Sequence, residues 1–337
     1  LNRIWEPALR VAKAERADLQ AMMEADGIDD RIRGWDWRYY TEKVRKAKYD
    51  IDEDALRPYF EVNAVRDGVF ALAGKLFGLQ FEQRDDLPTW HPDQQVFEVK
   101  EADGSHLAIL YMDYFSRPSK RGGAWMNALR SQSNVDGFVT PIVTNNFNFP
   151  APTEGSPSLL SLTNAETFFH EFGHALHGMF SNVRYESLSG TSTPRDFVEF
   201  PSQVMENWMR EPEVLRMFAN HFQTGEPIPD NLVADLVRAR HLNVALHTLR
   251  QVSFGVFDMG LHGPGDHRDR CGARGRAARR IRTDGWPGPT CRPGGGPRAR
   301  RGGRSRRSRA PRARSAARRG ARSRGPRDGL WSSHRVL

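Results

Sequence analysis

The ten residues FHEFGHALHG, at positions 169–178, contain the pattern His-Glu-x-x-His. On a helix, this spacing places the imidazoles of His170 and His174 one turn apart on one face, where both can bind a single tetrahedral metal ion. Glu171 then lies beside the water on that metal and can act as a general base. The pattern therefore predicts a helix that carries a zinc site. Five such residues also occur by chance on helices whose histidines are core or solvated side chains, and the bare pattern leaves that alternative open.

The residues around the pattern also indicate a helix. Thr163 and Glu166 have the spacing of an N-terminal capping box, and Gly178 suits the C-terminal end. His177 lies on almost the same helical face as His170. A rise of 1.5 Å per residue separates the two by about 10 Å along the axis, too far for both to bind one zinc ion. We therefore expect His177 to pack beside the site or to orient one of its ligands.

A catalytic zinc needs a third protein ligand, and its position distinguishes classes of zinc peptidase. Continuation as His-x-x-Gly-x-x-His is excluded, because His177 stands where the glycine would be and Phe180 where the histidine would be. The remaining candidate is a glutamate on a following helix. Thr193 suits the N-cap of such a helix and Pro194 its first position. Glu199 then falls about two turns into it, and we predict Glu199 as the third ligand.

Further residues of this second helix are candidates to orient the ligands. Pro201 removes a backbone donor and should bend the helix near the metal. Gln203 and Glu206 follow Glu199 at four and seven positions, so all three share one helical face. Gln203 and Glu206 either hold the metal-binding side chains in place or are simply solvated.

Periodicity divides the first 261 residues into helical and β-prone parts. Apolar residues recur at three and four positions in 1–87 and again from 162 to about 261. Between them, two β-prone runs, 96–100 and 107–112, flank an Asp-Gly turn, and 139–147 is a third such run. The apolar residues of the first helical part begin with Ile4, Leu9 and Val11. This pattern predicts a mainly α protein with a small β-sheet inserted.

Composition changes sharply after Leu261. Residues 1–261 carry 27 Lys and Arg against 37 Asp and Glu, whereas residues 262–337 carry 23 Arg, no Lys and four Asp. The second segment has few large apolar side chains, so we expect a disordered Arg/Gly/Pro-rich tail. Its prevalent residues use GC-rich codons, which indicates a shifted reading frame. The alternative is a basic tail that binds nucleic acid through phosphates, although no aromatic residue lies between Arg298 and Arg327 to stack on bases.

The remaining sequence features concern the compartment. No apolar run reaches the length of about eighteen residues that a membrane span requires. Both cysteines, Cys271 and Cys291, lie in the basic tail, so the rest of the chain offers no disulfide. The opening residues have the pattern of an amphipathic helix rather than of a signal peptide. We expect a cytoplasmic protein without a membrane partner.

Two longer motifs accompany the His-Glu-x-x-His pattern: SRPSKRGGAWM at 116–126 and SGTSTPRDFVEFPSQ at 189–203. With these motifs, residues 1–261 closely resemble the thimet oligopeptidase family of zinc metallopeptidases. Within that family the chain most resembles the bacterial peptidyl-dipeptidases, with oligopeptidase A as near neighbour. The resemblance implies a zincin-type, neurolysin-like catalytic region. It also implies one zinc ion per chain, bound by the residues matching His170, His174 and Glu199, with Glu171 as base.

The resemblance further implies the substrate and a departure from the family pattern. Members hydrolyse short unfolded peptides, and we expect release of C-terminal dipeptides by a monomer, with internal cleavage of peptides as the alternative. Members are about twice as long, so residues 1–261 correspond to a partial catalytic region without the N-terminal lobe and the last catalytic part. Family enzymes carry a downstream segment rich in His, Tyr and Gly, whereas this chain has no Tyr after Tyr185. Because the side chains of that segment stabilise the transition state, we expect this chain to be weakly active or inactive.

Overall fold

The computed structural model describes residues 1–49, 53–240 and 242–262. The expectations for the basic tail, namely disorder, a shifted frame and nucleic-acid binding, concern residues beyond 262 and lie outside the described residues. The described helices are all too short or insufficiently apolar to cross a membrane.

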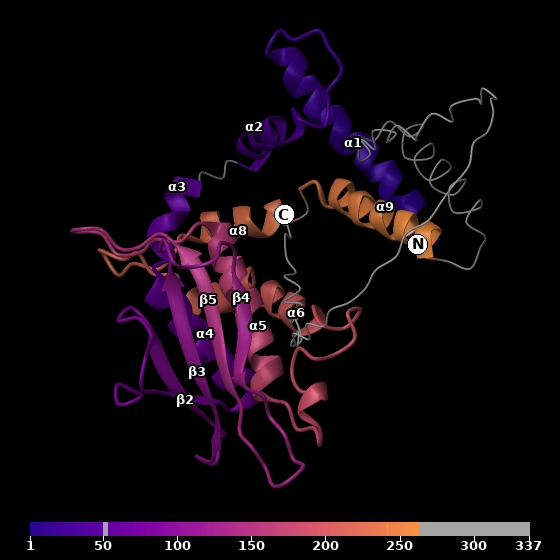
Figure 1. The fold of residues 1–337 in the computed structure, drawn as a ribbon. Coiled ribbons are helices and arrows are strands. Elements are labelled where there is room, and N and C mark those ends of the chain that lie inside the picture. Colours follow the sequence, from indigo (N-terminus) through magenta and orange to yellow (C-terminus); the bar gives the residue numbers. More distant parts are fainter. Residues whose placement is uncertain (50–52, 241, 263–337) are drawn as a thin grey trace, which may run out of the picture.

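Helices form most of the regular structure, as the sequence pattern predicts (Figure 1). The α-helices are α1 (Asn2–Ala25), α2 (Trp37–Tyr49), α3 (Glu53–Leu56), α4 (Val62–Phe77), α5 (Leu162–Met179), α6 (Phe200–Met209), α7 (Pro212–Phe218), α8 (Asp230–Ala239) and α9 (Val244–His262). Short 3-10 turns lie at Arg57–Tyr59 and Glu186–Leu188.

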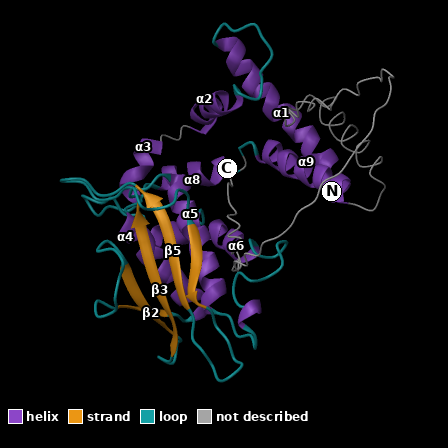
Figure 2. Ribbon diagram, viewed as in Figure 1, coloured by secondary structure: helices purple, strands orange, loops and turns teal. Residues whose placement is uncertain are grey.

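A five-stranded sheet is inserted between α4 and α5. Its strands are β1 (Gln80–Gln83), β2 (Gln95–Lys100), β3 (His106–Phe115), β4 (Trp125–Arg130) and β5 (Ile142–Phe149). The strand order is β1-β2-β3-β5-β4, and only the β3–β5 pair is parallel. The strand β4 therefore forms one edge of the sheet (Figure 2).

The predicted hairpin is confirmed, and two strands were not predicted. Strands β2 and β3 pair antiparallel around a turn in which Gly104 has a φ of +82°. The third β-prone run corresponds to β5, which begins at Ile142 rather than at residue 139. Strands β1 and β4 were missed because both are short, polar or largely exposed, and their burial does not alternate regularly.

Two hydrophobic clusters hold these elements together. The larger cluster packs α4, α5 and α7 with the sheet, and its most buried side chains include Phe147, Phe168 and Phe169. The smaller cluster joins α1, α2 and α9, which include the buried residues Trp5 and Leu249. Helices α1 and α9 lie side by side (Figure 1). Helix α5, which carries the His-Glu-x-x-His pattern, contributes apolar side chains to the larger cluster.

Candidate metal centre

Helix α5 carries the His-Glu-x-x-His pattern, and Ser161 is the N-cap of this helix. The Ser161 side chain accepts a hydrogen bond from the backbone N–H of Asn164. The predicted capping box at Thr163 and Glu166 is therefore wrong, because the helix begins one residue before Thr163. Glu166 instead forms an ion pair with Arg210, at 2.5 Å. This pair links α5 to the residue that follows α6.

A glycine brings α5 and α6 together. A Cβ atom at Gly173 would lie 2.6 Å from Cα of Ser202 and 2.7 Å from the carbonyl oxygen of Pro201. Such distances are too short for non-bonded carbon atoms, so only glycine permits this approach. The close packing places the start of α6 directly against the face of α5 that carries His174.

Helix α6 begins later than the sequence predicts. Residues 195–199 form turns, Phe200 is the first helical residue, and Glu199 is the N-cap. Thr193 is not the cap. Pro201 lies in the first turn, where its missing N–H has no intrahelical acceptor to lose, so the predicted kink does not arise. Glu199 is consequently held at a helix terminus rather than two turns into a helix.

The three predicted ligands converge despite this correction. Oε2 of Glu199 lies 3.3 Å from Nε2 of His170 and 3.1 Å from Nε2 of His174. One ligand atom from each of the three residues lies within 4.8 Å of the other two. Ligand atoms about 2.0–2.2 Å from a tetrahedral zinc ion are separated by roughly 3.3 Å. The donor set and its spacing therefore fit a zinc ion that would be held by these three side chains.

Glu206 contacts His170, the first of the three candidate ligands. Its Oε1 lies 2.5 Å from Nδ1 of His170, which leaves Nε2 directed toward Glu199. Burial disfavours the charged imidazole, but Glu206, with Glu171 and Glu199 nearby, outweighs that effect and raises the pKa of His170 above its usual value. The other candidate, Gln203, has an exposed side chain that does not contact the ligands. The structure thus separates two residues that the sequence left equivalent.

Ser202 orients Glu199 and was not singled out from the sequence. Its fully buried hydroxyl lies 3.0 Å from both the carbonyl oxygen and Oε2 of Glu199. The only sequence signal is a serine three residues after the ligand. That spacing becomes informative only when Glu199 is known to be the N-cap, so the error in the start of α6 concealed this contact.

Glu171 occupies an apolar, enclosed position beside the ligands. It is 6% exposed, and burial raises the pKa of its carboxyl to about 7 although His170 acts in the opposite direction. The backbone N–H of Met126, in the edge strand β4, lies near this carboxylate and acts weakly against the effect of burial on its pKa. Oε2 of Glu171 has no hydrogen-bond partner within the described part of the chain. A carboxylate with such a pKa can both accept and return a proton near neutral pH.

Asn145 fixes the backbone of this region. It is fully buried in β5, and its Nδ2 donates to the carbonyl oxygen of Glu171 at 2.8 Å. Periodicity identifies Asn145 only as one residue of a β-prone run, so this contact also could not be read from the sequence.

His177 lies outside the group of ligands. Its ring packs edge-on against Phe197, with centroids 6.0 Å apart, and burial lowers its pKa. This contact places His177 against the segment that leads into α6, and it is not one of the three clustered ligands.

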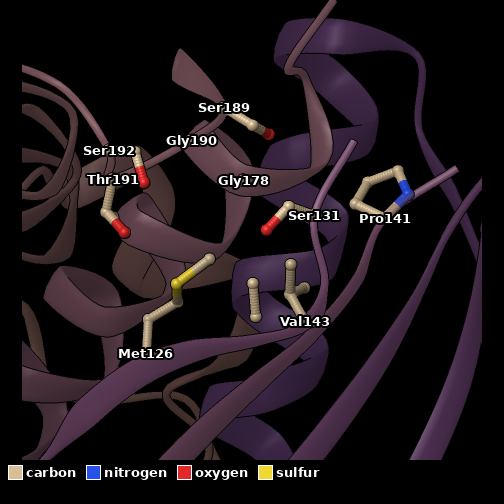
Figure 3. Close-up of a pocket in the computed structure, with 10 residues that line it drawn as sticks. Met126, Ser131, Pro141, Val143, Gly178, Ser189, Gly190, Thr191 and Ser192 are labelled. Atoms are coloured by element: carbon tan, nitrogen blue, oxygen red, sulfur yellow. The ribbon is translucent and has the colours of Figure 1, made fainter. Parts of the chain in front are cut away.

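A small cavity lies at the C-terminal end of α5 (Figure 3). It encloses about 40 Å³, and Met126 and Gly178 contribute to its wall. The other residues that line it are Ala128, Ser131, Pro141, Val143, Ser189, Gly190, Thr191 and Ser192. The side chain of Met126 lies against Gly178 in this wall, and neither Glu171 nor the three candidate ligands line the cavity.

Comparison with known proteins finds related sequences over most of the described chain. The profile described as Peptidase family M3 matches residues 1–271. Dipeptidyl carboxypeptidase of Escherichia coli (strain K12) is 43% identical over 263 residues, which cover 78% of this chain and 38% of that protein. Oligopeptidase A of the same organism is 39% identical over 251 residues, covering 74% and 37%. Saccharolysin of Saccharomyces cerevisiae is 32% identical over 278 residues, covering 78% and 39%. The chain thus spans less than two fifths of the length of these relatives.

Proposed function

The chain belongs to peptidase family M3, and we propose that residues 1–261 form a zincin-type, neurolysin-like part of a zinc peptidase catalytic region. One zinc ion per chain would be held by His170, His174 and Glu199. The observation that carries this proposal is the convergence of these three side chains. Oε2 of Glu199 lies 3.3 Å from Nε2 of His170 and 3.1 Å from Nε2 of His174, and the buried Glu171 is next to His170 in the sequence.

The chemistry divides between the metal and the protein. Zinc bound at this position would polarise a peptide carbonyl and lower the pKa of a water molecule toward about 7. Glu171 accepts the proton from the attacking water and passes it to the departing amine. Its pKa of about 7 allows both proton transfers near neutral pH. Glu206 and Ser202 keep His170 and Glu199 oriented throughout.

The surroundings of Glu171 suit an extended peptide. Strand β4 has a free edge beside this residue, and an extended peptide can add to such an edge through main-chain hydrogen bonds. The cavity of about 40 Å³ next to Met126 would accept a small side chain of that peptide. We propose short unfolded peptides as substrates and, following the name of the relative with 43% identity, release of C-terminal dipeptides.

Other aspects rest on the resemblance rather than on contacts in the structure. We propose a cytoplasmic monomer that acts on peptides. A nucleic-acid-binding role for the Arg-rich tail rests on composition alone, and nothing among the described residues favours it.

The proposal is tested by metal content followed by hydrolysis. Purified residues 1–337 should contain about one zinc per chain by plasma mass spectrometry, and His170→Ala should remove most of it. His247→Ala is the matched control, because His247 is exposed on α9 and distant from the site in sequence. A fluorogenic short peptide then reports hydrolysis, which we expect to be slow in this chain because the downstream His- and Tyr-rich segment is missing, and Glu171→Gln should abolish it while zinc is retained.

Two results would contradict the proposal. The first is zinc content that is the same in the parent chain and in His170→Ala. The second is hydrolysis that persists in Glu171→Gln at the parent rate.

A further inference from the structure

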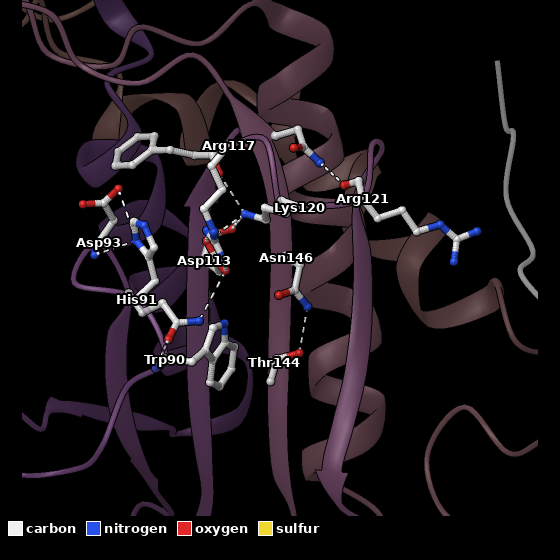
Figure 4. Close-up of polar contacts among 12 residues, drawn as sticks. Trp90, His91, Asp93, Asp113, Arg117, Lys120, Arg121, Thr144 and Asn146 are labelled. Carbon is white, nitrogen blue, oxygen red and sulfur yellow. Dashed lines mark hydrogen bonds and ion pairs between the residues drawn. The ribbon is translucent and has the colours of Figure 1, made fainter. Parts of the chain in front are cut away.

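The loop of residues 116–123, which precedes β4, is anchored by a buried charged network (Figure 4). The side chain of Asp113 is 1% exposed and accepts two hydrogen bonds from Arg117, both at 2.8 Å. Lys120 donates to the same carboxylate at 2.7 Å and to the carbonyl oxygens of Asp113 and Phe115. All three donors of the Lys120 ammonium are therefore used inside the fold, and the loop cannot move without breaking them.

Asn148 fixes the backbone of residues 121 and 123 in the same loop. Nδ2 of Asn148, in β5, donates to the carbonyl oxygens of Arg121 and Gly123, each at 2.7 Å. The backbone of Arg121 is thus fixed to the sheet on one side by Lys120 and on the other by Asn148.

The side chain of Arg121, unlike those of Arg117 and Lys120, is not held by the Asp113 network. Arg117 and Lys120 are paired with Asp113, whereas the exposed guanidinium of Arg121 forms no ion pair or hydrogen bond to any described residue. Figure 4 shows this side chain extending beyond the edge formed by β4, away from the other strands. The fold therefore presents an unpaired cation on a fixed backbone at the beginning of the edge strand.

The position of this cation relates to the candidate base through β4. The strand starts at Trp125 and packs against α5, the helix that carries Glu171. A peptide that pairs antiparallel with β4, with its scissile bond near Glu171, has its C-terminal residues at the start of the strand. Two extended residues span about 7 Å, so a short C-terminal segment ends in the vicinity of the loop. Arginine binds carboxylates through a planar, two-pronged set of donors.

We propose that Arg121 binds the C-terminal carboxylate of the peptide substrate. This inference rests on the proposed function. It also fixes the direction of the peptide, because the opposite direction would bring the substrate ammonium group to the arginine. A site of this kind selects peptides with a free C-terminus and favours cleavage a short distance from that end.

The test measures binding to zinc-loaded residues 1–337 carrying Glu171→Gln, so that peptides stay intact. Three peptides are compared by fluorescence anisotropy at low ionic strength. Two have the same sequence and end in a free carboxylate or in an amide, and the third is an amide in which the last residue is replaced by Glu. With Arg121 present, the free acid should bind about tenfold more tightly than either amide. The ratio should fall to about one in Arg121→Ala and be intermediate in Arg121→Lys, because a charge remains. Arg10→Ala, at an exposed position on α1, should leave the ratio unchanged.

Each contrary result has a distinct meaning. A preference for the free acid that persists in Arg121→Ala overturns the proposal, as does a zinc-loaded chain that binds no peptide. Tight binding of the Glu-ended amide overturns the assignment to the C-terminal carboxylate. Failure of the sample to retain zinc contradicts the proposed function itself, and the zinc content is measured on the same sample.

Discussion

Glu206 determines how the imidazole of His170 faces the other ligands. Its carboxylate holds Nδ1 at 2.5 Å, so Nε2 is presented toward Glu199. Removing a carboxylate that supports a metal-binding histidine lowers metal affinity about 10–100-fold. We therefore expect Glu206→Ala to weaken zinc binding by about this factor, measured by competition with a chromophoric chelator.

Gln203→Ala provides the matched control, because Gln203 lies on the same helix with an exposed side chain. Its zinc affinity should equal that of the parent chain. Equal losses in Gln203→Ala and Glu206→Ala would show that the contact to His170 is irrelevant to metal binding.

Single residues also show where sequence reasoning stops. The proximity of His170 and His174 was predictable because a four-residue spacing on a helix places them together. The approach of Glu199 to these histidines was predicted from residue type and order, although the element assigned to Glu199 was wrong. Ser202 and Asn145 were not predictable, because their contacts depend on how α5 packs against α6 and β5.

At the scale of elements, the approach of α5 to α6 depends on Gly173. Adding a Cβ 2.6 Å from Cα of Ser202 should push the two helices apart. Overpacking of this kind costs about 1–3 kcal/mol, which exceeds the gain of about 1 kcal/mol from replacing a helical glycine with alanine. We expect Gly173→Ala to lower the free energy of unfolding in urea and to weaken zinc binding, because Glu199 moves away from the histidines.

Gly255→Ala separates these two effects. Gly255 lies inside α9, and a Cβ there would meet only the Leu1 side chain at 3.5 Å, an ordinary contact. This variant should be as stable as the parent chain or more stable by up to about 1 kcal/mol. An unchanged or higher free energy of unfolding in Gly173→Ala would show that α5 and α6 can accommodate a Cβ atom at this position, contrary to the argument.

The network around Asp113 makes the stability of the loop depend on pH. Burial disfavours the charged carboxylate, but hydrogen bonds from Arg117 and Lys120 outweigh burial and hold the pKa of Asp113 below its usual value of 3.8. A carboxyl whose pKa is depressed on folding stabilises the fold above its unfolded pKa and loses that contribution as pH falls through the folded pKa. Asp113→Asn should therefore cost about 3–5 kcal/mol at pH 7 and reduce the loss of stability below about pH 4.

Urea denaturation at pH 7 and at pH 3 measures both effects. Asp136→Asn is the control, since Asp136 is exposed in the loop between β4 and β5. This control should change the free energy of unfolding by less than about 0.5 kcal/mol at either pH. A steeper acid loss in Asp113→Asn than in the parent chain would contradict the argument.

Element boundaries were predicted less well than element types. Helix α5 begins at Leu162, so Ser161 is its N-cap. The capping-box spacing at Thr163 does not identify this boundary. On α1, the predicted apolar residues Ile4 and Val11 are about half exposed. The residues Trp5, Ala8 and Ala12 form its buried face instead. Which apolar stripe is buried depends on the partner helices, which periodicity alone does not identify.

For the whole molecule, periodicity was sufficient to predict helices around a small sheet, since long segments of one period leave few alternatives. The strand order β1-β2-β3-β5-β4 was not predictable, because β4 and β5 reach their places through loops without a pairing signal. That order is what makes β4 an edge beside Glu171. The two hydrophobic clusters are a second property of the whole molecule that only the structure reveals.

The two clusters should contribute differently to metal binding. Leu160 is fully buried in the cluster that carries α5, and Leu249 is 2% exposed in the cluster of α1, α2 and α9. Each substitution to alanine removes the same atoms and costs about 2–5 kcal/mol locally. Leu160→Ala should weaken zinc binding and increase amide exchange in α5, because Leu160 directly precedes the cap of that helix. Leu249→Ala should increase amide exchange in α1 and α9 while zinc affinity stays at the parent value. Hydrogen exchange with mass spectrometry and a zinc titration measure both effects, and equal losses of zinc affinity would show instead that the clusters unfold as one unit.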